Sequence, residues 1–239
     1  MKIEIRDTKN PNVVQITTID ERWYYNDKTK IYRPSSTWIA NYYPKGAEFV
    51  KWVASKGWDE AELIKQEAGQ RGSRVHHMCE LLVLGNEIKM NDTFIDGEGE
   101  YKEPTADEWW AAMSFSDWWK QNKPVLRATE QVVESEEHNY SGTLDLEVEM
   151  DGQIWIVDIK TSKSIYPSHR IQLASYKEAY NKNAKMGIIQ VGYPLNKRGW
   201  KFTEVEDCFD LFLAAKRIWY EENKDVTPKQ REYPTSIKL

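Results

Sequence analysis

Cysteine is scarce in this chain of 239 residues, and its scarcity excludes two kinds of site. Cys79 and Cys208 are too few for a disulfide framework, and they form no CxxC pair for zinc or an iron–sulfur cluster. We expect both to be buried apolar residues. A GxxxxGK(S/T) phosphate loop is also absent, which excludes an ATP-driven motor of that kind in this chain.

Long hydrophobic runs are missing as well, so no segment is predicted to span a membrane. The N-terminal stretch MKIEIRDTKNPNVVQ lacks the apolar core of a secretory signal, and a cytoplasmic location is the default expectation. Positive charge is in deficit: the net charge is −5. This argues against a protein that coats nucleic acid by bulk charge, but it permits a local basic groove around an acidic site.

A pair of opposed aspartates is the most informative feature that is present. The stretch GTLDLEVEMDGQIWIVDIKTS has two alternating strands around Asp151-Gly152, a dipeptide that favours a two-residue type I′ turn. That turn places Asp145 opposite Asp158, with Lys160 on the same face. Opposed like charges destabilise a sheet unless something compensates, and a divalent cation such as Mg²⁺ or Mn²⁺ is an obvious compensator. The alternative is a solvated hairpin face, which Glu147 and Glu149 on the same side would favour.

The order of predicted elements indicates a mixed α/β protein. Helices are expected over 46–57, from 59 to 85 with a bend at Gly69 and Gly72, and over 106–123 after a Thr105 cap. Three strands (125–135, 141–150 and 153–162) precede a helix (168–183), two strands (186–195 and 200–205) and a closing helix (207–224). We expect a single domain over 1–239, with an N-terminal hairpin and helices over 1–58, a core over 59–220 and a tail over 221–239.

Two helical pairs of side chains stand out. Gln172 and Tyr176 lie at positions i and i+4, hence on one helix face, and so do His76 and Glu80. A lone helical histidine is more often a surface or core residue than a ligand. The significance of His76 therefore depends on its neighbours in sequence.

Four segments together resemble the RecB-type branch of the PD-(D/E)xK nucleases. They are RGSRVH (71–76), GTLD (142–145), DIK (158–160) and QLASY (172–176), which match the family motifs RG(T/S)xxH, G(T)xD, (D/E)xK and QxxxY in order. The upstream IYRPSST also resembles the PSxT element of phage and mitochondrial members, so the likeness runs from about Ile31 to Tyr180. The missing cysteines separate the chain from the iron–sulfur members and leave the stand-alone phage and mitochondrial exonucleases. The resemblance implies a restriction-endonuclease-like mixed sheet flanked by helices, with a helical N-terminal elaboration.

The resemblance also implies roles for individual residues. Metal ligands would be Asp145, Asp158, the Ile159 carbonyl and His76, with Mn²⁺ somewhat favoured over Mg²⁺ because imidazole is the softer ligand. Lys160 would orient or deprotonate the attacking water, and Gln172 and Tyr176 would orient the site or touch the scissile strand. Glu130 is either a further metal ligand or an ordinary strand carboxylate. Glu80 could orient the His76 imidazole, and His77 is expected to be structural. Candidate phosphate contacts are Arg74, Lys163, Arg170 and Lys177, although each could equally be a solvated charge.

The implied function is a metal-dependent DNA exonuclease that leaves 5′-phosphates, in phage-type recombination, repair or replication. A recombinase or single-strand-binding protein is a possible partner, and the host would be a bacterial or phage-infected cell. Two alternatives stay open. One is a structure-specific endonuclease, and the other is a non-catalytic nucleic-acid-binding protein on a nuclease fold, against which the intact Asp145, Asp158 and Lys160 argue.

Overall fold

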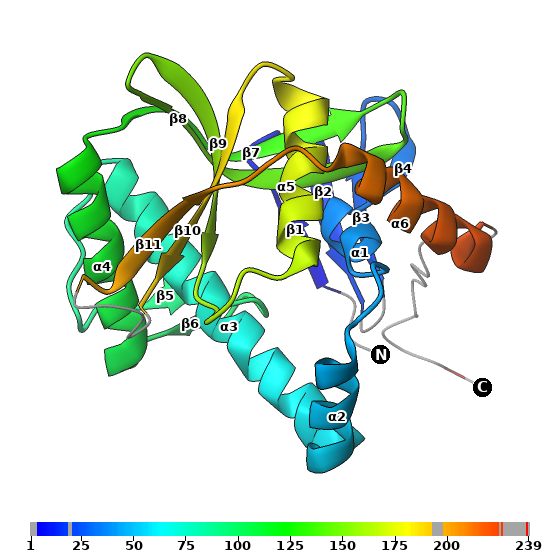
Figure 1. Cartoon of the computed structure of the whole chain (residues 1–239), viewed down its shortest axis with the longest axis horizontal. Coiled ribbons are helices and arrows are strands. Elements are labelled where there is room, and N and C mark those ends of the chain that lie inside the picture. The colour runs from blue at the N-terminus through cyan, green and yellow to red at the C-terminus, as the bar shows by residue number, and fades with distance from the viewer. Residues whose placement is uncertain (1–3, 19–20, 193–197, 225, 227–237, 239) are drawn as a thin grey trace.

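A five-stranded mixed sheet lies at the centre of the computed structural model, which describes residues 4–18, 21–192, 198–224, 226 and 238 (Figure 1). The strand order is β11-β10-β9-β8-β7, and β9 and β10 are parallel while the other neighbours are antiparallel. Their bounds are β7 Val125–Ser135, β8 Tyr140–Met150, β9 Gln153–Lys160, β10 Lys185–Val191 and β11 Trp200–Glu204. Parallel strands need a long crossover, and α5 (Pro167–Tyr180) supplies it between β9 and β10.

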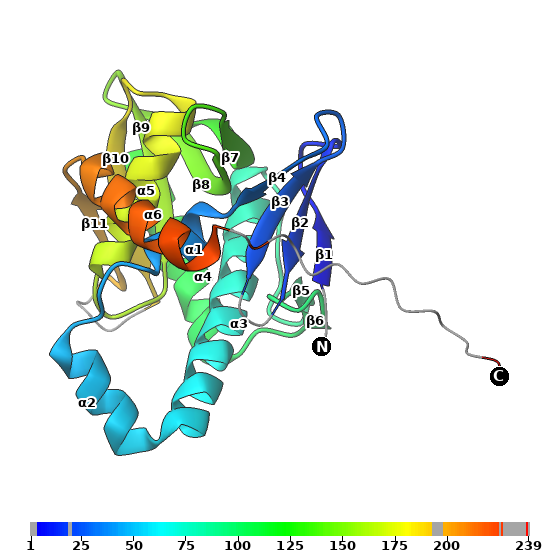
Figure 2. The same cartoon turned by 90° about the vertical axis from the view of Figure 1, so that its right-hand side faces the viewer.

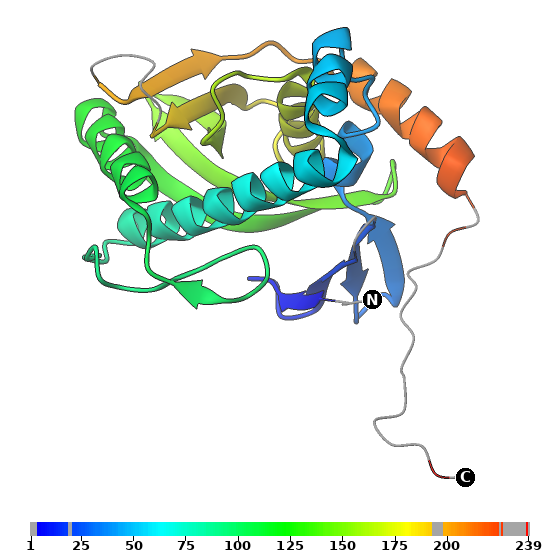
Figure 3. The ribbon, with the colours of Figure 1, turned by 90° about the horizontal axis from the view of Figure 1, so that it is seen from below.

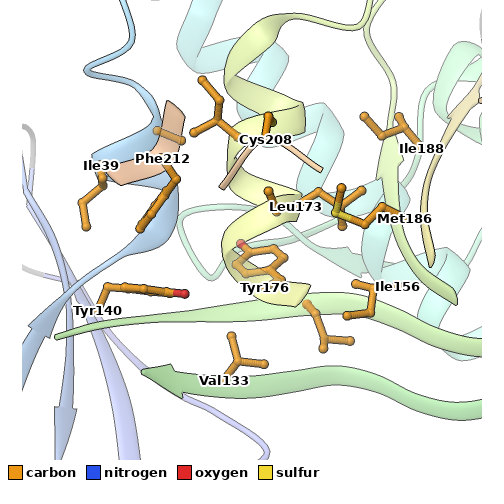
Figure 4. Close-up of a cluster of buried hydrophobic side chains, with 14 of the residues drawn as sticks. Ile39, Val133, Tyr140, Ile156, Leu173, Tyr176, Met186, Ile188, Cys208 and Phe212 are labelled. Atoms are coloured by element: carbon orange, nitrogen blue, oxygen red, sulfur yellow. The ribbon is translucent and has the colours of Figure 1, made fainter. Parts of the chain in front are cut away.

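Helices cover both faces of this sheet, as the mixed α/β prediction requires. On one face α5 packs with α1 (Ser36–Ala40) and α6 (Phe209–Asn223). Tyr176 and Leu173 of α5 belong to the apolar cluster between these helices and the strands (Figure 4). On the other face lie α3 (Trp58–Val83) and α4 (Ala106–Asn122), and Figure 3 shows α3 running across the sheet. The expected sheet flanked by helices is therefore confirmed.

The central hairpin has the predicted turn and register. Asp151 and Gly152 have φ values of 49° and 70°, the left-handed conformations that a type I′ turn requires at both central residues. Met150 pairs with Gln153, and the antiparallel ladder continues to Leu146 opposite Val157.

The N-terminal elaboration carries the two expected helices, α1 and α2 (Ala47–Lys56), and in addition a sheet that was predicted only in part. Four short strands form an antiparallel sheet in chain order (Figure 2): β1 Glu4–Asp7, β2 Val13–Thr17, β3 Arg22–Asn26 and β4 Ile31–Pro34. The predicted hairpin corresponds to β3 and β4. Strands of four or five residues carry little periodic signal, which explains why β1 and β2 were not predicted.

The prediction of a bend in the third helix was wrong, because α3 continues unbroken past Gly69 and Gly72. Together with α2 (Ala47–Lys56), its first turns project away from the sheet (Figure 2). By contrast, α4 begins as predicted, with a capping box between Thr105 and Glu108. The polar segment before it contains a small strand pair, β5 Phe94–Ile95 and β6 Tyr101–Lys102. The predicted C-terminal tail falls mostly outside the described residues, and none of the described helices is long and apolar enough to cross a membrane.

Candidate metal centre and cleft

The two central aspartates lie where β8 and β9 stop pairing. Beyond the Leu146–Val157 pair, a side chain replaces the backbone pairing between the strands. Asp145 Oδ2 accepts a hydrogen bond from the Ile159 backbone N–H at 2.7 Å. Asp158 is 1% exposed, and the Lys160 ammonium lies 2.8 and 2.7 Å from its two oxygens. The negative charge of the pair is thus partly compensated by protein groups.

The His76 side chain reaches the aspartates from α3, the helix that covers one face of the same strands. Its Nε2 donates to the Ile159 carbonyl at 2.8 Å, and its Nδ1 lies 3.5 Å from Asp145 Oδ1. Burial lowers the pKa of His76, but the charge and hydrogen bond of Asp145 outweigh burial and raise it to about 9. The pKa of Asp145, which burial raises, is lowered overall by His76. A protonated imidazole therefore bridges two of the groups that were expected to bind a metal.

Glu130 completes this cluster from β7, although its identity as a ligand was open at the level of sequence. Its position lies between the Thr129–Leu146 and Gln131–Leu144 pairs, hence opposite Asp145. Its φ of 49° is left-handed, which is uncommon for a residue with a side chain. Burial and the Asp145 charge raise its pKa to about 8.

The donor set of this cluster fits a divalent cation. Ligand atoms of His76, Glu130 and Asp145 all lie within 4.8 Å of one another. Carboxylates suit Mg²⁺ and Mn²⁺, while the imidazole adds a donor that Mn²⁺ accepts more readily. Burial first, and the Asp145 charge with it, raise the pKa of Glu130 to about 8 and that of Asp158 to about 6, so negative charge is costly at this position. A bound dication would replace the proton on His76 and relieve this cost.

Gln172 and Tyr176 form a hydrogen-bonded chain with the upstream PSST segment. Gln172 Nε2 donates to the Tyr176 hydroxyl at 2.6 Å and to Thr37 Oγ1 at 2.9 Å. The Tyr176 ring packs against Gly142, where an added Cβ would lie 2.4 Å from a ring carbon. The glycine of the GTLD segment is therefore required for the close approach of α5 to β8. The contribution of Thr37 was not predicted, although its segment was part of the family resemblance.

A cleft of about 370 Å³ opens beside the metal cluster. His76, Ile159 and Lys160, which belong to the cluster or contact it, line the cleft together with Gln172 and Arg71. No aspartate or glutamate is among the described residues that line it. Gly69 and Gly72 of α3 also border the cleft, and their missing side chains leave space there. In a chain with a net charge of −5, this acid-free lining is a local exception.

The four predicted phosphate contacts do not converge on this cleft. Arg74 is 8% exposed, and its guanidinium binds Glu108 at 2.6 and 3.1 Å and Asp96 at 3.5 Å, so its assignment to a DNA surface is corrected to a structural ion pair. Lys177 pairs with Asp207 at 2.6 Å. Arg170 is half-buried near Cys208, and Lys163 lies exposed on the loop after β9.

Arg71, three residues before Arg74, lines the cleft in its place. It was quoted in the RGSRVH segment but not chosen as a contact. Two neighbouring side chains on α3 make other contacts: Glu80 binds Lys9 at 2.5 Å rather than the His76 ring, and His77 Nδ1 accepts from the Ile95 N–H at 3.0 Å. The structural role expected for His77 is consistent with this contact.

Comparison with known proteins yields structural matches but no sequence matches. No protein-family model matches the chain, and no curated protein does. The crystal structure of LHK-Exo in complex with dAMP matches with a TM-score of 0.43 and 12% identity, over 80% of this chain and 88% of that one. An alkaline exonuclease (LHK-Exo) from Laribacter hongkongensis matches with a TM-score of 0.39 and 11% identity, over 80% of this chain and 91% of that one.

Proposed function

We propose that this protein is a metal-dependent DNA exonuclease that hydrolyses phosphodiester bonds. One observation carries the proposal: a cluster of carboxylates and an imidazole, with a lysine beside it, lies at the edge of a cleft that is lined by cations and by no acid. Such a cleft attracts a phosphate backbone, and the cluster fits the cation that phosphodiester hydrolysis commonly uses. The intact Asp145, Asp158 and Lys160 argue against a non-catalytic binding protein.

His76, Glu130 and Asp145 would hold the metal, with Asp158 and the Ile159 carbonyl completing its ligands. When bound, the metal lowers the pKa of water and stabilises the charge that develops on the phosphate in the transition state. Either Mg²⁺ or Mn²⁺ fits the oxygen donors, and His76 favours Mn²⁺.

Lys160 would act as a proton donor or charge screen rather than as a base. Burial lowers its pKa, but the charges of Asp158 and Asp145 raise it above the ordinary value, so its Nζ is an ammonium at neutral pH. From its position at the cleft wall this ammonium would orient the attacking water or bind a phosphate oxygen. Gln172, held by Thr37 and Tyr176, also lines the cleft and would position the scissile strand.

Exonuclease action is tested with linear and covalently closed circular DNA, each single- and double-stranded, incubated with Mg²⁺ or Mn²⁺. We expect degradation of linear DNA alone, 5′-phosphate products, and loss of activity by at least about 100-fold in Asp158→Ala, since removal of one transition-state group commonly costs that much. Asp117→Ala, which removes an exposed carboxylate outside the cluster, serves as the control. Cutting of circles would instead indicate an endonuclease. If no substrate is cleaved but DNA binding is retained, the protein is a binding protein and not a nuclease.

The partner proposal follows the resemblance to phage-type nucleases alone. A recombinase or single-strand-binding protein is therefore the proposed partner, and DNA ends are the proposed substrate.

A further inference from the structure

Lys9 reaches from the N-terminal sheet to the two elements that carry the metal cluster. It lies on the turn between β1 and β2, which Thr8 stabilises through hydrogen bonds to the Asn10 and Val13 carbonyls. Its Nζ donates to the Thr129 carbonyl of β7 at 3.0 Å and lies 2.5 Å from Glu80 Oε1 of α3.

The contact on β7 fixes the peptide bond that precedes Glu130. Because β7 is the edge strand of the central sheet, the Thr129 carbonyl has no sixth strand to pair with among the described residues. Glu130 itself has a left-handed φ of 49°, and such conformations persist only when surrounding contacts hold them. The hydrogen bond from Lys9 is one such contact, and the conformation it holds keeps the Glu130 side chain near Asp145.

The contact on α3 fixes the other half of the cluster. Glu80 lies four residues after His76, so the two side chains are on one face of the helix, one turn apart. Through Glu80 and Thr129 a single ammonium therefore joins the helix that carries His76 to the strand that carries Glu130. Their ligand atoms lie within 4.8 Å of each other across this junction.

We propose that Lys9 is a positioning residue for the metal centre, by which the N-terminal sheet sets the separation of Glu130 and His76. The inference rests on the proposed function for the presence of a metal. The charge of Lys9 and its positioning role affect metal affinity in opposite directions. The Lys9 ammonium, near the carboxylates of Glu80 and Glu130, repels a metal ion, so loss of Lys9 would strengthen metal binding if only charge mattered. Loss of positioning weakens it.

The test is direct calorimetric titration of the metal-free protein with Mn²⁺, which needs no catalytic activity. We expect Lys9→Met to weaken Mn²⁺ binding roughly tenfold or more, the range found when groups that orient metal ligands are removed. Lys9→Arg keeps a donor for both partners and should stay within about threefold of the wild type. Glu80→Gln, which loosens only the link to α3, should fall between the two.

Lys28→Met is the matched control, because Lys28 is exposed on the turn between β3 and β4 of the same sheet. Unchanged or tighter Mn²⁺ binding in both Lys9→Met and Glu80→Gln, beside a wild type that binds, would overturn the role of Lys9 alone. A wild type that binds no Mn²⁺ would overturn the metal centre and this inference with it. If Lys9→Met does not fold, the Mn²⁺ affinities of the other variants test the proposal. Glu80→Gln should then bind Mn²⁺ more weakly than Lys9→Arg and Lys28→Met, and equal affinities would overturn the role of Lys9.

Discussion

Glu130 illustrates what the proposed metal centre would require of a single residue. In the metal-free protein the Glu130 side chain is half-buried beside that of Asp145, and the two negative charges repel each other. The pKa of Glu130 is raised to about 8 for these reasons, so the folded protein retains a proton there that the unfolded chain loses near pH 4.5. This proton stabilises the fold fully below pH 4.5, and the stabilisation is lost as the pH rises towards 8.

Glu130→Gln should therefore stabilise the metal-free protein at high pH. We expect the free energy of unfolding to increase by on the order of 1–3 kcal/mol at pH 8.5, because glutamine needs no ionisation, and to change little at pH 4.5. Denaturant unfolding at both pH values with EDTA present measures this. Glu136→Gln, an exposed carboxylate beyond the end of the same strand, should change neither value. Equal destabilisation by Glu130→Gln at both pH values would contradict the expected protonation.

The unbroken course of α3 shows how a whole element is set by its surroundings. Glycine in a helix interior costs about 1 kcal/mol relative to alanine, which is why two glycines three residues apart predicted a bend. The C-terminal half of α3 buries Val75, Met78 and Cys79 against the sheet and α4, and this packing offsets the cost. Gly69 and Gly72 instead leave space at the cleft wall.

Gly69→Ala should stabilise the protein, because no atom lies within 4 Å of the position a Cβ would take. We expect a gain of about 0.5–1 kcal/mol in the free energy of unfolding, measured by denaturant titration. Gly142→Ala is the opposite case and should destabilise, since its Cβ would overlap the Tyr176 ring. If α3 bends at Gly69 in solution, the alanine would bring no gain.

The distribution of charge over the whole molecule separates two neighbouring arginines. Arg74 is buried between Glu108 and Asp96, whereas Arg71 lines the cleft and makes no ion pair or side-chain hydrogen bond within the described part of the chain. The acidic chain as a whole repels DNA, and the acid-free cleft provides the surface where a backbone can approach. Substitutions of these two arginines should therefore affect different properties of the protein.

Arg71→Met should weaken DNA binding with little effect on stability, and Arg74→Met should do the reverse. Fluorescence anisotropy in EDTA, at several salt concentrations, measures the first. We expect the slope of log affinity against log salt to fall by about 0.7–0.9 in Arg71→Met, the loss of one phosphate contact. Arg74→Met leaves the buried Glu108 carboxylate without its cation, while Asp96 keeps Lys102, and should cost about 3–5 kcal/mol. A loss of DNA affinity in folded Arg74→Met, with none in Arg71→Met, would contradict the proposed cleft.

Local chemistry was sufficient to predict much of this chain. Asp151-Gly152 fixes the turn of the central hairpin, the turn fixes the register, and the register brings Asp145 and Asp158 to the same point. Thr105 and Glu108 fix the start of α4 in the same way. These features depend on residues a few positions apart, whose preferences are expressed in any fold that accommodates them.

Contacts between distant segments were decided by the packing of elements on the sheet. Sequence spacing could not show that α3 crosses the strands at an angle that turns His76 towards Ile159 and Arg74 away from the cleft. Nor could it show that Lys9 meets Thr129 across 120 positions. A side chain's direction on a helix is periodic, but which direction faces a site depends on where the helix lies, and that is set by the apolar surface that all the elements bury together.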